Sequence, residues 1–115
     1  MSRTRWRIRL GDYVNQDFVQ ILEYTLDQFG ARQADICEVT LTEAIAELVD
    51  GPDIVGSRRR DEILPGLRTL HVARHGRKGC HFIMCRAIGD DEIEIMRLLY
   101  DGMDLAAHVP PSALR

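Results

Sequence analysis

Hydrophobic and polar residues alternate at the start of the chain and then change to a helical period. Alternation over Arg5–Leu10 is typical of a half-buried strand, because successive side chains point to opposite faces. From Asp12 to Gly30 apolar residues recur every three or four positions, which predicts a helix with Asp12 as its N-cap and Gly30 as its C-cap. A second helix is predicted over about 32–49, and the short link makes the two helices an antiparallel hairpin. The apolar residues are Trp6, Ile8 and Leu10 in the strand, Val14, Phe18, Ile21, Leu22, Leu26 and Phe29 in the first helix, and Ala34, Cys37, Leu41, Ala44, Ile45 and Leu48 in the second.

The second half of the chain has the pattern of strands joined by turns. Strands are predicted over Leu67–Ala73, Cys80–Ile88 and Glu92–Leu99, and a single helical turn is predicted over Gly102–His108. The residues 75–79 form a basic hairpin tip between the first two of these strands, since their two glycines permit positive φ.

Arg97 departs from the pattern of the last strand. It has the same parity as Ile93 and Ile95, which face the predicted core. Two explanations are open: a β-bulge turns its side chain away, or its guanidinium reaches a carboxylate at the end of the sheet.

These elements predict an α+β fold in the order β-α-α-β-β-β. The helical hairpin packs on one face of a small, mainly antiparallel twisted sheet, because a sheet with one apolar face needs a cover. A length of 115 residues is that of one domain, spanning 1–115. The place of the first strand is open, since it can join either edge of the other three strands.

Charge is strongly segregated along the chain, although the net charge is only -3. The range 1–10 holds four arginines and no acid, 11–50 nine acids and one base, 51–86 eight bases and three acids, and 87–115 six acids and two bases. This indicates a surface with two opposite faces, although ordinary solvated charge gives the same pattern. No apolar run approaches the roughly 20 residues of a membrane span, and three irregularly spaced cysteines are typical of a reducing cytoplasm.

A series of short motifs runs through the chain. They are Asp17-Phe18, Ile21-Leu22, Tyr24-Thr25, Phe29-Gly30-Ala31, Gly51-Pro52, Gly56-Ser57-Arg58, Arg60-Asp61-Glu62-Ile63, Pro65-Gly66-Leu67-Arg68, His71-Val72-Ala73-Arg74, Gly76-Arg77, Gly79, His81-Phe82, Met103-Asp104-Leu105 and His108. With this ordered set, from about Trp6 to His108, the chain resembles the ParE-type toxins of bacterial type II toxin–antitoxin systems, within the RelE/ParE superfamily.

The resemblance implies a small cytoplasmic protein that poisons DNA gyrase through the GyrA subunit and uses no cofactor or metal. It also implies a co-encoded ParD-like antitoxin, which neutralises the toxin in a hetero-oligomer such as a heterotetramer or a larger assembly. DNA contact is then expected only through the antitoxin or gyrase, and no membrane binding is expected. Some relatives in the superfamily instead cut messenger RNA on the ribosome, so a RelE-type endoribonuclease is the alternative.

The basic hairpin tip is the predicted target-binding surface. A cationic tip can dock on an acidic protein patch or near gyrase-bound DNA phosphates, although a solvated tip that keeps edge strands soluble explains the same residues. The target-binding candidates are Arg74, His75, Arg77, Lys78, Arg86, Arg97 and His108. The groove between the hairpin and the sheet is the predicted antitoxin acceptor, with Tyr13, Ile36, Val39, Phe18 and Leu22 as candidates.

Residues for catalysis or metal binding are present in incomplete sets. Histidines can supply the acid and the base of RNA cleavage, but no Glu or Tyr clearly completes a set with them. Cys80, His81 and Cys85 match no common zinc spacing. The four histidines are His71, His75, His81 and His108. The sequence therefore predicts a protein that acts by binding another macromolecule.

Overall fold

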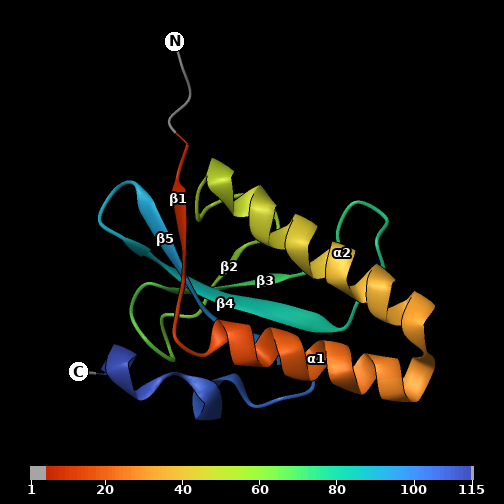
Figure 1. Ribbon diagram of the computed structural model, residues 1–115. Helices are drawn as coiled ribbons and strands as arrows, with labels where there is room; N and C mark the ends of the chain where they lie inside the picture. Colours follow the sequence, from red (N-terminus) through yellow and green to blue (C-terminus); the bar gives the residue numbers. More distant parts are fainter. Residues whose placement is uncertain (1–4, 115) are drawn as a thin grey trace.

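Two helices lie across one face of a five-stranded sheet (Figure 1), which confirms the predicted α+β fold. The structure is a computed structural model that describes residues 5–114. In chain order the elements are β1 (Arg7–Leu10), α1 (Val14–Phe29), α2 (Ala31–Glu47), the 3-10 helix η1 (Leu48–Asp50), β2 (Arg58–Arg59), β3 (Leu67–His71), β4 (His81–Ile88), β5 (Glu92–Tyr100) and the 3-10 helices η2 (Leu105–His108) and η3 (Pro111–Leu114).

The sheet has the strand order β1-β5-β4-β3-β2. β1 pairs with β5 in parallel, with Ile8 opposite Ile93, and the other neighbouring strands are antiparallel. The first strand therefore joins the β5 edge, which the sequence had left open. β2 was predicted to be part of a loop, because two residues are too few to show an alternating pattern.

The helical hairpin turns at Gly30, which has a φ of 90° and is the predicted C-cap of α1. Glycine adopts this conformation without steric cost, so a single residue separates the two helices. Figure 1 shows the hairpin spanning the sheet, with its turn projecting beyond the strands. Within residues 5–114, neither helix has the length and apolarity to cross a membrane.

The start of α1 differs from the prediction, because Asp12 is not its N-cap. The helix begins at Val14 after Tyr13, and no side chain caps it. The backbone N–H of Gly11 still donates to the carbonyl of Ile95 on β5, at 2.8 Å. The chain thus leaves the sheet only at Gly11, and Asp12 lies in the connecting turn.

The main core fills the space between the hairpin and the sheet. Its buried residues are Val14, Leu41, Ala44, Leu48, Leu70, Val72, Ile83, Cys85, Ile93, Ile95 and Leu98. Leu10, Leu26 and Phe29 belong to the predicted apolar stripes, yet all three are more than half exposed. Leu10 ends an edge strand, and Leu26 and Phe29 lie toward the projecting turn, so the stripe of α1 is longer than the sheet beneath it.

The other face of the sheet has a second, smaller core. The C-terminal segment, residues 105–114 (blue in Figure 1), packs there together with Ile63 and Leu64 of the loop after β2. The buried residues are Leu67, Met84, Met96, Leu99, Val109 and Ala113. The predicted single turn of helix before Pro110 is confirmed as η2, and it is the start of this segment.

A β-bulge in β5 explains Arg97. Met84 of β4 pairs with Arg97 and the next β4 residue pairs with Ile95, so Met96 is the extra residue of the bulge. The bulge takes Arg97 off the core face, and its guanidinium reaches the carboxylate of Asp17 on α1, at 2.7 Å. Both explanations that the sequence left open therefore apply.

Candidate functional site

The β3–β4 loop, residues 72–80, contains the basic hairpin tip. Its turn closes with a hydrogen bond of 2.9 Å from the backbone N–H of Arg77 to the carbonyl of Arg74. His75 and Gly76 both have positive φ, 51° and 79°, as a type I′ turn requires. This conformation costs a non-glycine residue about 1–2 kcal/mol, so other contacts must stabilise the turn. The turn brings Arg74 and Arg77 side by side.

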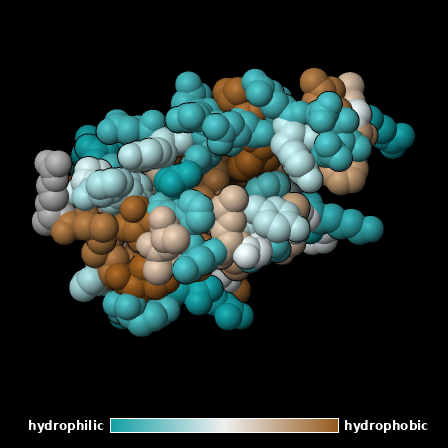
Figure 2. Space-filling view, turned by 90° about the horizontal axis from the view of Figure 1, so that it is seen from below, coloured by the Kyte–Doolittle hydropathy of each residue, from teal (hydrophilic) through white to brown (hydrophobic). Residues whose placement is uncertain are grey.

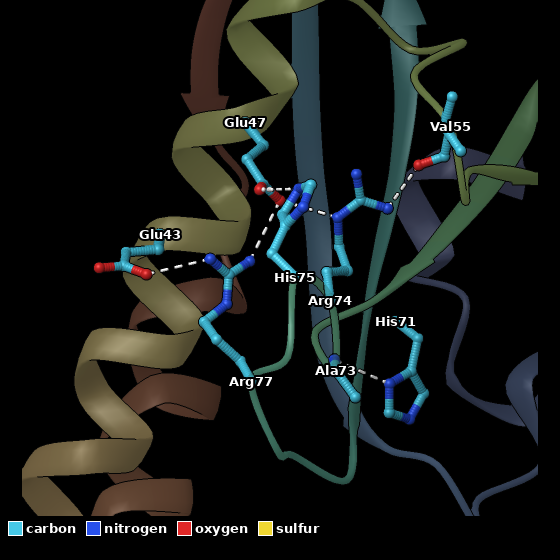
Figure 3. A network of polar contacts seen from close by, with 8 residues as sticks. All are labelled: Glu43, Glu47, Val55, His71, Ala73, Arg74, His75 and Arg77. Atoms are coloured by element: carbon cyan, nitrogen blue, oxygen red, sulfur yellow. Dashed lines mark hydrogen bonds and ion pairs between the residues drawn. The ribbon is translucent and has the colours of Figure 1, made fainter.

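Three side chains of this loop converge on one carboxylate of α2 (Figure 3). Glu47 Oε2 accepts from Arg74 Nε at 2.8 Å and from Arg77 Nη2 at 3.2 Å, and Glu47 Oε1 lies 2.8 Å from His75 Nε2. Glu43, one turn earlier on α2, accepts from Arg77 Nη1 at 3.0 Å. Partial burial alone would raise the pKa of Glu47, but hydrogen bonds and charge from Arg74 and Arg77 outweigh it and lower that pKa.

Arg74 also ties the loop to the segment that follows α2. Its Nη1 donates to the carbonyl of Val55 (Figure 3). A Cβ on the neighbouring Gly56 would lie 2.2 Å from Nη1, so only glycine leaves room for this contact. Arg74 therefore joins α2, the β3–β4 loop and the loop after η1.

Gly79 does not have the positive φ that was predicted for it, but its lack of a side chain is still required. Its φ is not positive, unlike that of Gly76. A Cβ on Gly79 would lie 2.6 Å from Val72 Cγ2. Gly79 therefore allows the two ends of the loop to pack closely, and His75 takes the second positive-φ position.

Lys78 is the loop cation with a free charge. It is exposed and makes no ion pair within the part of the chain that the structure describes. The side chains of Arg74 and Arg77 are only 14% and 20% exposed. The carboxylates of α2 thus neutralise most of the positive charge of the predicted basic tip. Among the described residues, Lys78 keeps an unpaired positive charge that a partner can contact.

His71, at the end of β3, has both ring nitrogens engaged. The backbone N–H of Ala73 donates to Nδ1 at 3.0 Å, and Nε2 lies 2.9 Å from Asp101 Oδ2. Because Nδ1 accepts, the ring proton is on Nε2 and is donated to the carboxylate. Neither nitrogen can exchange a proton with a substrate unless one of these bonds breaks.

The charges of Asp101 and His71 also act on His81, which lies on the neighbouring strand β4. His81 is buried on β4 with its ring against Tyr100, and burial lowers its pKa. Burial raises the pKa of the Cys85 thiol to about 12, so this side chain stays protonated at neutral pH. Across residues 5–114 no three or more His, Cys, Asp or Glu side chains group in a way that could hold a metal ion. An open hollow lies elsewhere, over Trp6 and the residues 50–55, and no histidine lines it.

Half-buried Arg97 and buried Asp17 form an ion pair at the open edge of β5. Asp17 is 6% exposed, and it accepts from Arg97 Nε at 2.7 Å, from Arg97 Nη2 at 2.9 Å and from the backbone N–H of Leu98 at 3.0 Å. The hydrogen bond to Asp17 raises the pKa of Arg97, and Tyr13 stacks over the guanidinium with its ring centroid at 5.1 Å. Arg97 Nη1 also donates to the carbonyl of His108 at 3.3 Å. This cluster joins α1, β5 and the C-terminal segment.

The seven target-binding candidates fall in three separate places. Arg74, His75, Arg77 and Lys78 share the β3–β4 loop, while Arg97 and His108 meet at the Asp17 cluster. Arg86 lies toward the far end of β4 and donates to Glu94 at 3.1 Å. The structure therefore brings together the loop residues and leaves the other three away from them.

The antitoxin-binding candidates lie on the hairpin with different exposures. Tyr13, Ile36 and Val39 are exposed, whereas Phe18 and Leu22 are half-buried and Phe18 packs against the core. Further exposed apolar residues of the hairpin are Val19, Tyr24, Leu26 and Phe29. The view from below shows hydrophobic groups interrupting a largely hydrophilic surface (Figure 2).

Sequence reasoning missed the carboxylates of this site. Glu43 and Glu47 are four residues apart, so they lie on one face of α2, but their cationic partners are about 30 residues away in the chain. Asp17 had a visible signal, because it stands three residues after Val14 on the apolar side of α1.

Comparisons with known proteins agree with this architecture. The family described as "ParE toxin of type II toxin-antitoxin system, parDE" matches residues 8–105. A protein named "Toxin ParE1", from two strains of Mycobacterium tuberculosis, is 33% identical over 86 residues, which are 75% of this chain and 80% of that relative. A solved structure titled "Chromosomal ParDE TA system from P. aeruginosa" has a TM-score of 0.69 at 20% identity, covering 84% of this chain and 96% of that chain. At this identity the structural likeness shows the fold alone.

Proposed function

The chain belongs to the ParE toxin family of type II toxin–antitoxin systems, and from this membership we propose that it binds and inhibits DNA gyrase. The contact is made with the GyrA subunit, and a ParD-like antitoxin neutralises the toxin. The place of action is the cytoplasm, where gyrase works on the bacterial chromosome.

The observation that carries the proposal is the construction of the β3–β4 loop. A strained turn is held against α2 by ion pairs, and its outer side presents Lys78 and the exposed part of His75. A rigid loop loses little entropy on docking, so it is suited to recognising a macromolecular surface. Its exposed charge makes the association sensitive to salt.

The engagement of His71 supports binding over catalysis. A general base needs a free lone pair within reach of the proton that it removes. In His71 one nitrogen accepts from Ala73 and the other pairs with Asp101. We therefore propose that the protein is not an enzyme, and RelE-type cleavage is the competing outcome in the test below.

Gyrase supercoiling assays test this function directly. The purified toxin is added to gyrase and relaxed plasmid, and GyrA capture is measured on the immobilised toxin. We expect loss of supercoiling and retention of GyrA, both weakened by salt. Intact gyrase activity, with cleavage of ribosome-bound messenger RNA in a parallel reaction, would show that the RelE alternative is right.

The antitoxin proposal rests on the family and on the exposed apolar surface of the hairpin. The chain with the matching fold comes from a structure titled as a ParDE toxin–antitoxin system. Exposed apolar side chains on α1 and α2 are suited to an amphipathic segment that folds on binding. Co-expression with the product of the neighbouring reading frame should restore growth and yield a co-purifying hetero-oligomer. If that product neither rescues growth nor co-purifies, it is not the antitoxin.

A further inference from the structure

The ion pairs of the β3–β4 loop divide its cations into two groups. Arg74 and Arg77 point toward α2, and His75 reaches the same carboxylate from the exposed side, with 64% of its side chain accessible (Figure 3). Lys78 is exposed and makes no ion pair among residues 5–114. The inward group matches two guanidinium charges with the two carboxylates of α2, so it contributes little net charge to the surface.

The backbone of the turn depends on this inward group. His75 is the one non-glycine with positive φ among residues 5–114, and the type I′ geometry sets Arg74 and Arg77 next to each other. Two adjacent guanidinium groups repel unless an anion lies between them. Glu47 Oε2 occupies that position, 2.8 Å from Arg74 Nε and 3.2 Å from Arg77 Nη2.

We infer that Glu47 is a positioning residue for target binding. It gathers Arg74 and Arg77 inward and holds the turn in one shape, so that Lys78 is the side chain that meets the anionic target. The inference rests on the proposed function, since it names the contact within that surface. It also changes the sequence-based prediction, because the two arginines become supports of the loop.

Hydrogen exchange on the isolated toxin tests the positioning role without gyrase. Glu47→Gln keeps the shape of the side chain and removes its charge. We expect the hydrogen-bonded amides of Arg74 and Arg77 to exchange about tenfold faster in this variant, while the strands keep their protection. Glu38→Gln, at an exposed site on the same helix, should leave the loop unchanged. Unchanged loop exchange in Glu47→Gln would overturn the positioning role.

Gyrase capture tests the contact. Lys78→Ala should weaken GyrA retention by about three- to tenfold and leave loop exchange unchanged. Arg32→Ala removes the same charge from an exposed position on α2 and is the matched control. Equal retention of wild type and Lys78→Ala would overturn the assignment of Lys78. If wild-type toxin does not retain GyrA at all, the proposed function fails, and the exchange experiment still decides the role of Glu47.

Discussion

Single carboxylates hold distant parts of this toxin together. Asp17 is buried, yet each of its oxygens has a donor: the guanidinium of Arg97 binds both, and the N–H of Leu98 binds one. The N–H of Leu98 lies on the edge of β5 beyond its pairing with β1, which ends at Ile95. Asp17 thus accepts from a backbone N–H that has no partner strand beside it, and it supplies the counter-ion of the half-buried Arg97.

Removal of the Asp17 carboxylate should be costly. Asp17→Ala leaves Arg97 without its counter-ion and the Leu98 N–H without an acceptor, so we expect a loss of about 3–5 kcal/mol in the free energy of unfolding. Urea unfolding of wild type and variant measures this loss. Glu23→Gln, at an exposed site on the same helix, should change the free energy by about 0.5 kcal/mol or less. If Asp17→Ala changes the free energy of unfolding no more than the Glu23→Gln control, the cluster contributes nothing to stability.

The Glu47 carboxylate predicts how stability depends on pH. Its pKa in the folded protein lies below the ordinary value of 4.5, because Arg74 and Arg77 outweigh the opposing effect of burial. A lowered pKa contributes stability above the unfolded-state value, and that contribution disappears as pH falls through the folded-state value. The difference in stability between wild type and Glu47→Gln should therefore be largest near neutral pH and shrink below pH 4.5. A difference that stays constant from neutral pH to about pH 3 would contradict this role.

At the scale of elements, the loop after η1 and the β3–β4 loop are shaped around the side chain of Arg74. The loop after η1 carries Gly56 where Arg74 Nη1 passes to the carbonyl of Val55. The β3–β4 loop in turn carries Arg74, so this contact holds the two loops against each other. This mutual fit explains how a short basic loop can remain ordered at the surface.

Two glycine substitutions separate backbone strain from this fit. Gly56 and Gly66 both have positive φ, 97° and 83°, but a Cβ at Gly66 meets nothing within 4 Å. Gly66→Ala should cost about 1–2 kcal/mol, the strain alone. Gly56→Ala should cost about 2–4 kcal/mol, because it also displaces the guanidinium of Arg74. Equal losses in thermal or urea unfolding would mean that Arg74 moves aside freely.

At the scale of the whole molecule, the sheet is covered on both sides but the hairpin is not. The hairpin covers one face and the C-terminal segment the other, which leaves the outer surfaces of α1 and α2 with exposed apolar residues. Ile36 and Val39 lie there with about half of their surface accessible. Such a surface is typical of a protein that binds a partner through its helices.

The double substitution Ile36→Ser with Val39→Ser tests this surface. Because both side chains are exposed, we expect each to change the free energy of unfolding by about 0.5 kcal/mol or less. The variant should capture less of the co-expressed neighbour protein. Val55→Ser, at a site that is 90% exposed elsewhere on the molecule, is the control. Capture equal to that of wild type would place the antitoxin on another surface.

The sequence by itself determined the elements and their order. The hydrophobic period identified both helices and four of the five strands, and Gly30 marked the hairpin turn, because these signals depend on neighbours a few residues apart. The same reasoning named the basic loop as a candidate surface. It failed for β2 and for the N-cap of α1, since neither has a repeating pattern to detect.

Only the tertiary structure decided which charges meet. Glu47 meets Arg74 and Arg77 because α2 crosses the sheet beside the β3–β4 loop, and Asp17 meets Arg97 because a bulge turns one side chain at the edge of β5. The C-terminal segment likewise covers the second face of the sheet through contacts far apart in the chain. The type of a residue predicts the kind of partner it requires, an opposite charge or an apolar surface. Which residue becomes that partner depends on how the backbone brings distant segments together.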